Sequence, residues 1–197
     1  AERVYTDHRQ LLENEKLDAV LVCTGPSSHA AITLDCIEQR LPVFIEKPPA
    51  MNLAEVKLLQ SRSEELGVPV MVGLMKRYAL AYQRLKSIME SPNFGSVSAV
   101  QARFSLGWKK GNGFALLLDA GIHMVDLLRF LMGEVVEVSF QKHEDQETHL
   151  SYAILLKFAN GSVGNLLITD RCSWLRANER VEVVGDGNLV CVDNSIH

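Results

Sequence analysis

The chain has 197 residues, of which 47% are hydrophobic and 22% are charged, and its formal net charge is −4. This composition is typical of a globular protein, and it provides no basic surface for nucleic acid or for an anionic membrane. The longest apolar runs are far shorter than a membrane span. The four cysteines are scattered without a Cys-x-x-Cys motif, so we expect reduced thiols in a cytoplasmic protein.

The first third of the chain has the pattern of a parallel sheet with crossover helices. Apolar runs predict three buried strands, at 18–23, 42–45 and 68–72. Ser27 and Ser28 are expected to cap a helix that runs to about Arg40. Asn52-Leu-Ala-Glu55 has the form of a capping box, for a helix that stops at Gly67. The order β-α-β-α-β predicts a partial Rossmann-type sheet with right-handed crossovers.

The pattern changes near residue 74, beyond which turn signals are more frequent. Helices are predicted over about 80–90 and over 116–132, the second ended by Gly133. Strands are expected at 97–106, 135–141, 150–159, 162–170, 180–184 and 188–192. Asn160-Gly161 and Gly185-Asp186-Gly187 favour hairpins, because glycine accepts the positive φ of such turns. The second part therefore predicts a mostly antiparallel sheet with few helices, so the chain combines α/β and α+β architecture.

The segment Phe44-Ile-Glu-Lys-Pro-Pro49 places an acid and a lysine directly after the second predicted strand. Open α/β sheets bind ligands at the carboxyl ends of their strands, and Pro48 stiffens the chain beyond Lys47. A lysine there is commonly a solvated surface charge, and on position alone the two interpretations are equally weighted. A functional ammonium would donate to a substrate oxygen and stabilise charge during hydride transfer. A cis bond at Pro48 is allowed at modest cost.

Asp119, His123 and Asp126 stand at i, i+4 and i+7 of a predicted helix, which places them on one face. Their neighbours are mostly apolar, so this polar stripe needs partners. A core histidine satisfied by Asp119 or by backbone is the ordinary explanation. An acid one turn away also orients an imidazole for general-base work, and we expect open space at Gly121, which favours function. The spacing suits a divalent metal, but no further His/Glu cluster supports one, so we expect no metal.

Thr24-Gly-Pro-Ser-Ser-His29 joins a strand end to a helix N-terminus, where N–H groups and the helix dipole suit a ligand. This signal is weak alone, because many α/β turns look alike. Arg77 follows the third strand and by itself is typical of a surface arginine, and Trp108, Lys109 and Lys110 could line a cleft. No Gly-x-Gly-x-x-Gly occurs, so the sequence lacks the phosphate-cradling turn of a dinucleotide site.

Taken together, these segments resemble the glucose–fructose oxidoreductase, inositol dehydrogenase and rhizopine catabolism family (Gfo/Idh/MocA). The matching segments occur in the family's order across nearly the whole chain, at 18–29, 43–48, 72–78, 119–126 and 181–187. Each is weak by itself, whereas the Glu-Lys-Pro and Asp-x-Gly-x-His motifs in register are specific.

The resemblance implies a nicotinamide-dependent dehydrogenase. Residues 1–74 would be the C-terminal part of a dinucleotide-binding Rossmann domain, and residues 75–197 a substrate and oligomerisation domain with an open sheet. Lys47 would contact both substrate and cofactor, His123 would act as general base or acid on the substrate hydroxyl, and Asp119 would orient His123. The other cofactor-binding residues that the resemblance implies are Thr24, Gly25, Pro26, His29, Glu46 and Arg77.

The family's first strand and glycine-rich turn have no counterpart here, so we expect an incomplete copy that by itself binds a dinucleotide poorly. For the parent protein we predict hydride transfer between NAD or NADP and a secondary alcohol of a sugar, inositol or related polyol. A non-catalytic binding or assembly module that keeps the fold is the alternative, and glycoside hydrolysis through transient oxidation is a third. We also expect a homo-oligomer, a dimer or tetramer through the open sheet, without nucleic-acid or membrane partners.

Overall fold

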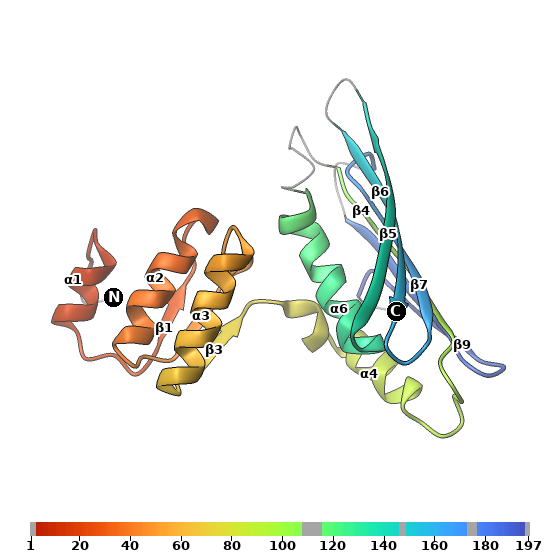
Figure 1. The fold of residues 1–197 in the computed structure, drawn as a ribbon, viewed down its shortest axis with the longest axis horizontal. Helices are drawn as coiled ribbons and strands as arrows, with labels where there is room; N and C mark the ends of the chain where they lie inside the picture. Colours follow the sequence, from red (N-terminus) through yellow and green to blue (C-terminus); the bar gives the residue numbers. More distant parts are fainter. Residues whose placement is uncertain (1–2, 108–115, 146–148, 173–176, 196–197) are drawn as a thin grey trace. The chain divides into compact units, whose positions relative to one another are not determined.

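The structure is a computed structural model that describes residues 3–107, 116–145, 149–172 and 177–195. The chain forms two compact units, Ala1–Leu74 and Met75–His197 (Figure 1). Within the described ranges, no helix is long and apolar enough to cross a bilayer.

The first unit contains the predicted parallel sheet, which is confirmed. Strands β1 (Val20–Val22), β2 (Val43–Ile45) and β3 (Val70–Val72) pair in the order β1-β2-β3. Helices α2 (Pro26–Glu38) and α3 (Leu53–Leu66) form the two crossovers. A further helix that the sequence analysis did not identify, α1 (His8–Asn14), precedes the sheet and is capped by Asp7, whose side chain accepts from the Arg9 N–H at 2.9 Å.

The capping residues decide where the two crossover helices begin and end. The Asn52 side chain accepts from the Glu55 N–H at 2.9 Å and α3 ends at Gly67 with φ +63°, as predicted. The returning Glu55 carboxylate accepts from the N–H of Met51, one residue earlier than the ideal capping box. The expected caps Ser27 and Ser28 are wrong: Gly25 is the N-cap of α2, because Pro26, with its fixed φ, already occupies the first helical turn.

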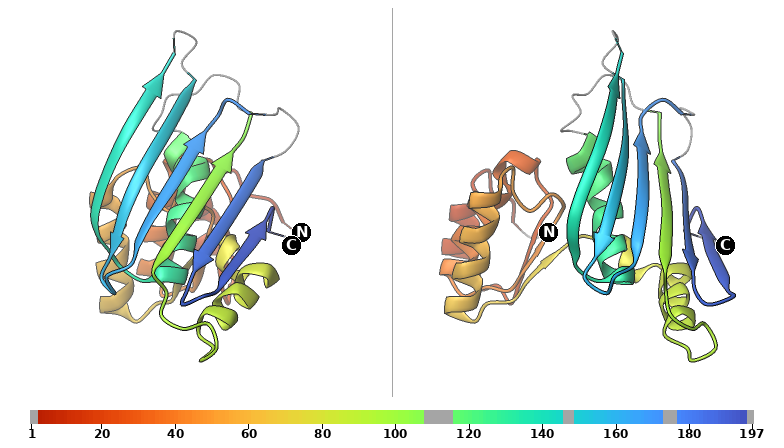
Figure 2. Two further views of the ribbon diagram at one scale, coloured as in Figure 1. Left: turned by 90° about the vertical axis from the view of Figure 1, so that its right-hand side faces the viewer. Right: turned by 45° about the vertical axis from the view of Figure 1, so that its right-hand side comes forward.

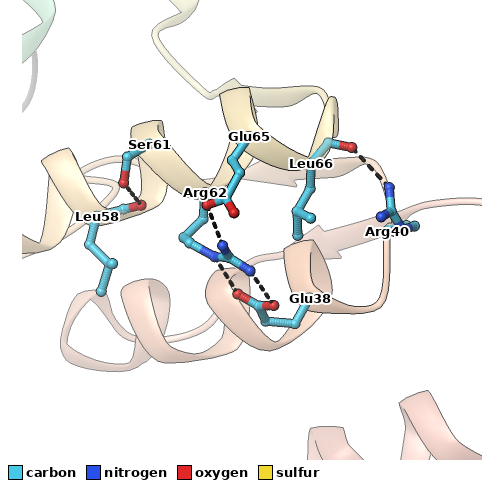
Figure 3. Close-up of polar contacts among 7 residues, drawn as sticks. All are labelled: Glu38, Arg40, Leu58, Ser61, Arg62, Glu65 and Leu66. Carbon is cyan, nitrogen blue, oxygen red and sulfur yellow. Dashed lines mark hydrogen bonds and ion pairs between the residues drawn. The ribbon is translucent and has the colours of Figure 1, made fainter.

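Helices α2 and α3 are joined by a bidentate ion pair (Figure 3). Arg62 donates to both carboxylate oxygens of Glu38, from Nε and Nη2, at 2.7 Å each. Arg40, which has φ +59° in the turn after α2, donates to the Leu66 carbonyl at 3.2 Å. Helix α2 therefore ends at Glu38 rather than near Arg40, since the chain has already turned by residue 40.

The second unit is built on a six-stranded sheet. Its strands are β4 (Ala99–Ser105), β5 (Val135–Glu144), β6 (Leu150–Phe158), β7 (Val163–Thr169), β8 (Asn178–Val184) and β9 (Leu189–Asp193). The strand order is β5-β6-β7-β4-β8-β9, and every neighbouring pair is antiparallel except β4 with β7. Gly161 and Gly187 adopt positive φ in the two predicted hairpins. The mostly antiparallel sheet is confirmed.

Helices α4 (Leu80–Met89) and α6 (Ile122–Met132) cover one face of this sheet (Figure 2). A short 3₁₀ helix, η1 (Met75–Tyr78), precedes α4. Alternate strand residues point into the core on that face, among them Val100, Ala102, Tyr152, Ile168 and Val181. Burying this face supplies the main stabilisation of the unit, at roughly 25 cal/mol for each Å² of apolar surface removed from water.

The outer face of the sheet carries exposed apolar side chains between charged ones. Leu155, Val163 and Leu167 on β6 and β7 are 62%, 52% and 40% exposed. On β4 and β8, Arg103 and Arg180 stand opposite each other. This face of the sheet thus presents both apolar and charged side chains at the surface of the unit.

The helix that carries Asp119 and His123 departs from the regular α-helix predicted over 116–132. Its first turn, η2 (Leu117–Gly121), is a π-helix, and α6 follows it without a break. The open space expected at Gly121 is wrong, because a Cβ there would lie 3.1 Å from Ile168 Cδ1 and 3.3 Å from Leu117 Cδ2. A side chain at this position would need Ile168 or Leu117 to shift by a few tenths of an ångström, so the π turn packs closely against β7.

Candidate active site

The carboxyl ends of the three parallel strands bring several predicted residues of the first unit together. The Glu46 N–H donates to the Val22 carbonyl at 2.9 Å, and the Gly73 N–H donates to the Ile45 carbonyl at 2.8 Å. The residues that follow β1, β2 and β3 therefore lie along one edge of the sheet. Thr24, Glu46 and Lys47 belong to this strand-end edge, where open α/β sheets bind ligands.

Lys47 lies between Glu46 and the cis peptide bond to Pro48. The cis bond agrees with the possibility raised by the sequence. Lys47 and Glu46 are both half-buried, and a Glu46 carboxylate oxygen accepts from the Lys47 N–H at 3.2 Å. The acid is thus folded back on the backbone of its neighbour, which fixes the direction of the chain at the strand end.

Gly73, which sequence reasoning used only as a segment marker, shapes the same edge. A Cβ at this position would lie 3.3 Å from Glu46 Oε2 and 3.4 Å from the ring of Phe44. A larger residue would therefore push against the Glu46 carboxylate. The sequence signal that could have identified Gly73 is its position directly after β3, which matches the position of Glu46 directly after the neighbouring strand β2.

His29 is 1% exposed and connects two loops of the strand-end edge. Its Nδ1 lies 2.7 Å from the Pro48 carbonyl oxygen and its Nε2 lies 2.9 Å from the Thr24 carbonyl oxygen. Carbonyl oxygens only accept, so both contacts are hydrogen bonds when both ring nitrogens carry hydrogen. The imidazole acts on this edge by holding the loops that contain Thr24 and Lys47. Direct contact between His29 and a cofactor stays a prediction.

The N-terminus of α2 completes the strand-end edge. Thr24, Gly25 and Pro26 are exposed, and a Cβ at Gly25 would meet nothing within 4 Å. Ser28 Oγ donates to Thr24 Oγ1 or to the Gly25 carbonyl, each at 2.8 Å. The exposed loop leaves room for a ligand beside the positive end of a 13-residue helix.

The second unit carries Asp119 and His123 on η2 and α6. Asp119 lies in the π turn and is half-buried, whereas His123 lies in the first turn of α6 and is 7% exposed. A π turn holds more residues than an α turn, so the two side chains do not have the i, i+4 geometry of a regular α-helix. Their predicted roles as base and orienting acid stay predictions.

Arg77 lies in η1, and its guanidinium is bound to Asp126 of α6. Nε donates to Asp126 Oδ2 at 2.9 Å, and Nη2 contacts Oδ1 of the same carboxylate. This hydrogen bonding raises the pKa of the Arg77 guanidinium. Asp126 thus has a basic partner that the sequence analysis did not assign to it, and the cofactor contact predicted for Arg77 stays a prediction. In the described part of the chain, no group of three or more His, Cys, Asp or Glu residues could hold a metal ion.

A buried ionic cluster, which sequence reasoning also missed, lies between η1, α4 and β8. Lys76 and Glu179 form an ion pair with side chains 9% and 4% exposed. The Tyr82 hydroxyl donates to Glu179 at 3.0 Å, and Ser195 donates to the same oxygen. Burial raises the pKa of Tyr82, so the phenol stays protonated and donates. The partners are distant in sequence, so no local motif identifies the cluster.

Comparison with known proteins identifies both units. Residues 1–74 match the model of the GFO/IDH/MocA oxidoreductase family, NAD-binding Rossmann fold, and residues 82–189 match that of the GFO/IDH/MocA C-terminal domain. The chain belongs to the GFO/IDH/MocA family. The predicted resemblance and fold class are therefore confirmed. Trp108, Lys109 and Lys110, the weaker cleft candidates, lie outside the described residues.

Among GFO/IDH/MocA relatives, a myo-inositol 2-dehydrogenase of Thermotoga maritima is 28% identical over 98% of this chain and 61% of its own length. An NAD⁺-dependent scyllo-inositol 2-dehydrogenase of Bacillus subtilis is 26% identical over 97% of this chain and 59% of its own length. The crystal structure of a probable dehydrogenase from Thermotoga maritima superposes with a TM-score of 0.87 at 26% identity, covering 96% of this chain and 61% of that one. The chain thus spans about 60% of the length of these relatives.

Proposed function

We propose that the complete protein is an NAD(P)-dependent dehydrogenase that oxidises a secondary alcohol of an inositol, a sugar or a related polyol. The observation that carries this proposal is the position of Lys47 on the strand-end edge of a unit that matches an NAD-binding Rossmann fold. Two relatives that match nearly the whole length of this chain are named inositol dehydrogenases, which supports the proposed substrate class.

The chain's own residues supply proton transfer and charge stabilisation in this proposal. His123 takes the proton of the substrate hydroxyl, as a neutral imidazole can do near neutral pH. Asp119 orients His123. The Lys47 ammonium donates a hydrogen bond to the same oxygen and stabilises the negative charge that develops there. The proposal thus requires Lys47 and His123 to act on one hydroxyl group.

The donor set of the strand-end edge fits part of a dinucleotide. Thr24 offers a hydroxyl, Glu46 a carboxylate and Lys47 an ammonium, and the space at Gly25 leaves the loop accessible. These groups suit the ribose and nicotinamide end, where we propose that Thr24, Gly25, Pro26, Glu46, Lys47 and Arg77 bind, with His29 holding the loops. When bound, NAD or NADP accepts the hydride. The glycine-rich diphosphate turn is not in this sequence.

The test is cofactor binding and turnover by the complete protein that contains this sequence. Fluorescence titration with NADH and with NADPH measures binding and distinguishes the two cofactors. Reduction of the oxidised cofactor is then followed with myo-inositol, scyllo-inositol and glucose. Saturable binding with turnover of one of these polyols supports the proposal. No binding of either cofactor would refute it and would favour the non-catalytic binding or assembly module.

We also propose that the second unit associates with a second copy through the outer face of its sheet. The exposed apolar side chains of β6 and β7 support this proposal, because water-exposed leucine and valine side chains gain from burial against an equivalent face. A cytoplasmic location stays an expectation from composition.

A further inference from the structure

Helix α6 is held to η1 by a charged contact between Asp126 and Arg77, the residue for which a cofactor contact is also proposed. Arg77 donates from Nε to Asp126 Oδ2 at 2.9 Å and from Nη2 to the other carboxylate oxygen. Two parallel N–H···O bonds fix both the separation and the relative rotation of the two planar groups. A lysine in place of Arg77 would keep the charge but would lose this fixed geometry.

The surroundings make this contact stronger than an ordinary surface ion pair. The Asp126 side chain is 10% exposed and that of Arg77 is 35% exposed, so water screens the pair only in part. The guanidinium also lies 5.5 Å from the ring centroid of Phe130, one turn further along α6. The Lys86 ammonium of α4 lies 5.7 Å from the centroid of the same Phe130 ring and donates to the Leu131 carbonyl at 3.1 Å.

The Arg77–Asp126 pair lies close to His123, the candidate base, along α6. Asp126 comes three residues after His123, which places the two side chains on neighbouring positions of one helical face. Any rotation or sliding of α6 would therefore move the carboxylate and the imidazole together. A displacement of about 1 Å at a catalytic group can lower a rate by about 100-fold.

We propose that Arg77 and Asp126 are positioning residues, which fix α6 and thereby the orientation of His123 toward the substrate. This inference rests on the role proposed above for His123. The anchor at the other end of the contact is η1, which directly follows the last residue of the first unit. The pair thus fastens α6 to the first helical segment of the second unit.

The test compares Asp126→Asn, Arg77→Gln, Arg77→Lys and the Arg77→Gln/Asp126→Asn double variant in the complete protein. Glu134→Gln is the matched control, because it removes the exposed Arg129–Glu134 ion pair at the end of the same helix. With myo-inositol, we expect each single variant to lower kcat by about 10- to 100-fold, and the double variant to lower it no further, because the two residues act as a unit. Arg77→Lys should recover only part of the loss.

The deuterium isotope effect on kcat, with myo-inositol deuterated at C2, separates positioning from mere loss of folded protein. A mispositioned base slows the chemical step, so the isotope effect should rise in Asp126→Asn and Arg77→Gln. A smaller folded fraction lowers kcat but leaves the isotope effect unchanged. Additive losses in the double variant with an unchanged isotope effect would overturn the proposal.

Hydrogen exchange gives a readout that does not depend on activity. In Asp126→Asn and Arg77→Gln, amides of residues 117–132 should exchange about tenfold faster, whereas Glu134→Gln should leave residues 117–128 unchanged. Unchanged exchange in the first two variants would overturn the proposal. If the complete wild-type protein oxidises no polyol, the proposed function fails, and exchange alone then decides whether the pair holds the helix.

Discussion

Lys47 and His123 are ordinary residues by type, and their surroundings are what single them out. Lys47 comes two residues after Ile45, a fully buried strand residue, and precedes a cis proline, whereas His123 is 7% exposed in the first turn of an apolar helix. A solvated lysine or a purely structural histidine would tolerate replacement by alanine without loss of chemistry. Substitution therefore distinguishes the functional from the structural explanation.

We predict that Lys47→Ala and His123→Ala each lower kcat of the complete protein by about 100- to 10,000-fold, since each removes a group that transfers a proton or stabilises charge. Steady-state kinetics with a polyol and NAD or NADP measures the effect. Lys57→Ala and His143→Ala are the controls, because both side chains are exposed and each lies in the same unit as its counterpart. Near-normal turnover in both test variants would exclude the assigned roles.

His29 gives a prediction on stability at the same scale. In His29→Ala, the buried Pro48 carbonyl loses its contact with the imidazole, and an unsatisfied buried group costs about 1–3 kcal/mol, whereas the Thr24 carbonyl lies in an exposed loop that water can reach. We therefore expect the free energy of unfolding to fall by about 1–3 kcal/mol. Urea unfolding measures this change. His8→Ala is the control, since that imidazole lies on a partly exposed surface beside Asp35, and a loss no larger than the control's would contradict the role given to His29.

At the scale of elements, the regular pattern was predictable and the exceptions follow from tertiary contacts. The apolar runs of β1 to β3 and the turn glycines Gly67 and Gly161 were recognisable because they act locally. The π turn of η2 was not, because its close packing against Ile168 depends on a strand that comes much later in the chain.

In the candidate site, too, residues in local motifs were predictable from the sequence, whereas contacts between distant elements were not. Short motifs indicated Lys47 and His123, but nothing local shows that Arg77 pairs with Asp126, 49 positions away, or Lys76 with Glu179, 103 positions away. Such pairs arise only when the fold brings distant elements together.

The buried Lys76–Glu179 pair ties η1 to β8, and its removal should destabilise the second unit. Lys76→Met leaves the buried Glu179 carboxylate without its cation, which costs about 3–5 kcal/mol in comparable sites. Thermal and urea unfolding measure the loss. Lys142→Met is the control: its partner Glu144 is exposed, so its loss should cost no more than about 1 kcal/mol. An equal loss of unfolding free energy in the two variants would show that the buried ion pair contributes no more to stability than the exposed one.

At the scale of the whole molecule, the open sheet face predicts self-association. Leu155→Asp combined with Leu167→Asp places two charges on the outer face and should convert an oligomer of the complete protein into monomers, since a desolvated charge opposes burial. Light scattering coupled to size-exclusion chromatography measures the mass. Glu137→Asp, on the edge strand of the same face, should leave it unchanged. A wild-type protein that is monomeric at high concentration would remove the proposal.

The sheet of the second unit has a central strand, β4, whose two neighbours are both made long after it. β4 pairs with β7 in parallel and with β8 on its other side. During synthesis, β4 lacks its full set of neighbouring strands until β8, which ends at Val184, has left the ribosome. Until then the apolar surfaces of β4, α4 and α6 are exposed to water. The first unit has no such delay, because its three strands are consecutive. Nascent chains should therefore depend on chaperones chiefly during production of the second unit.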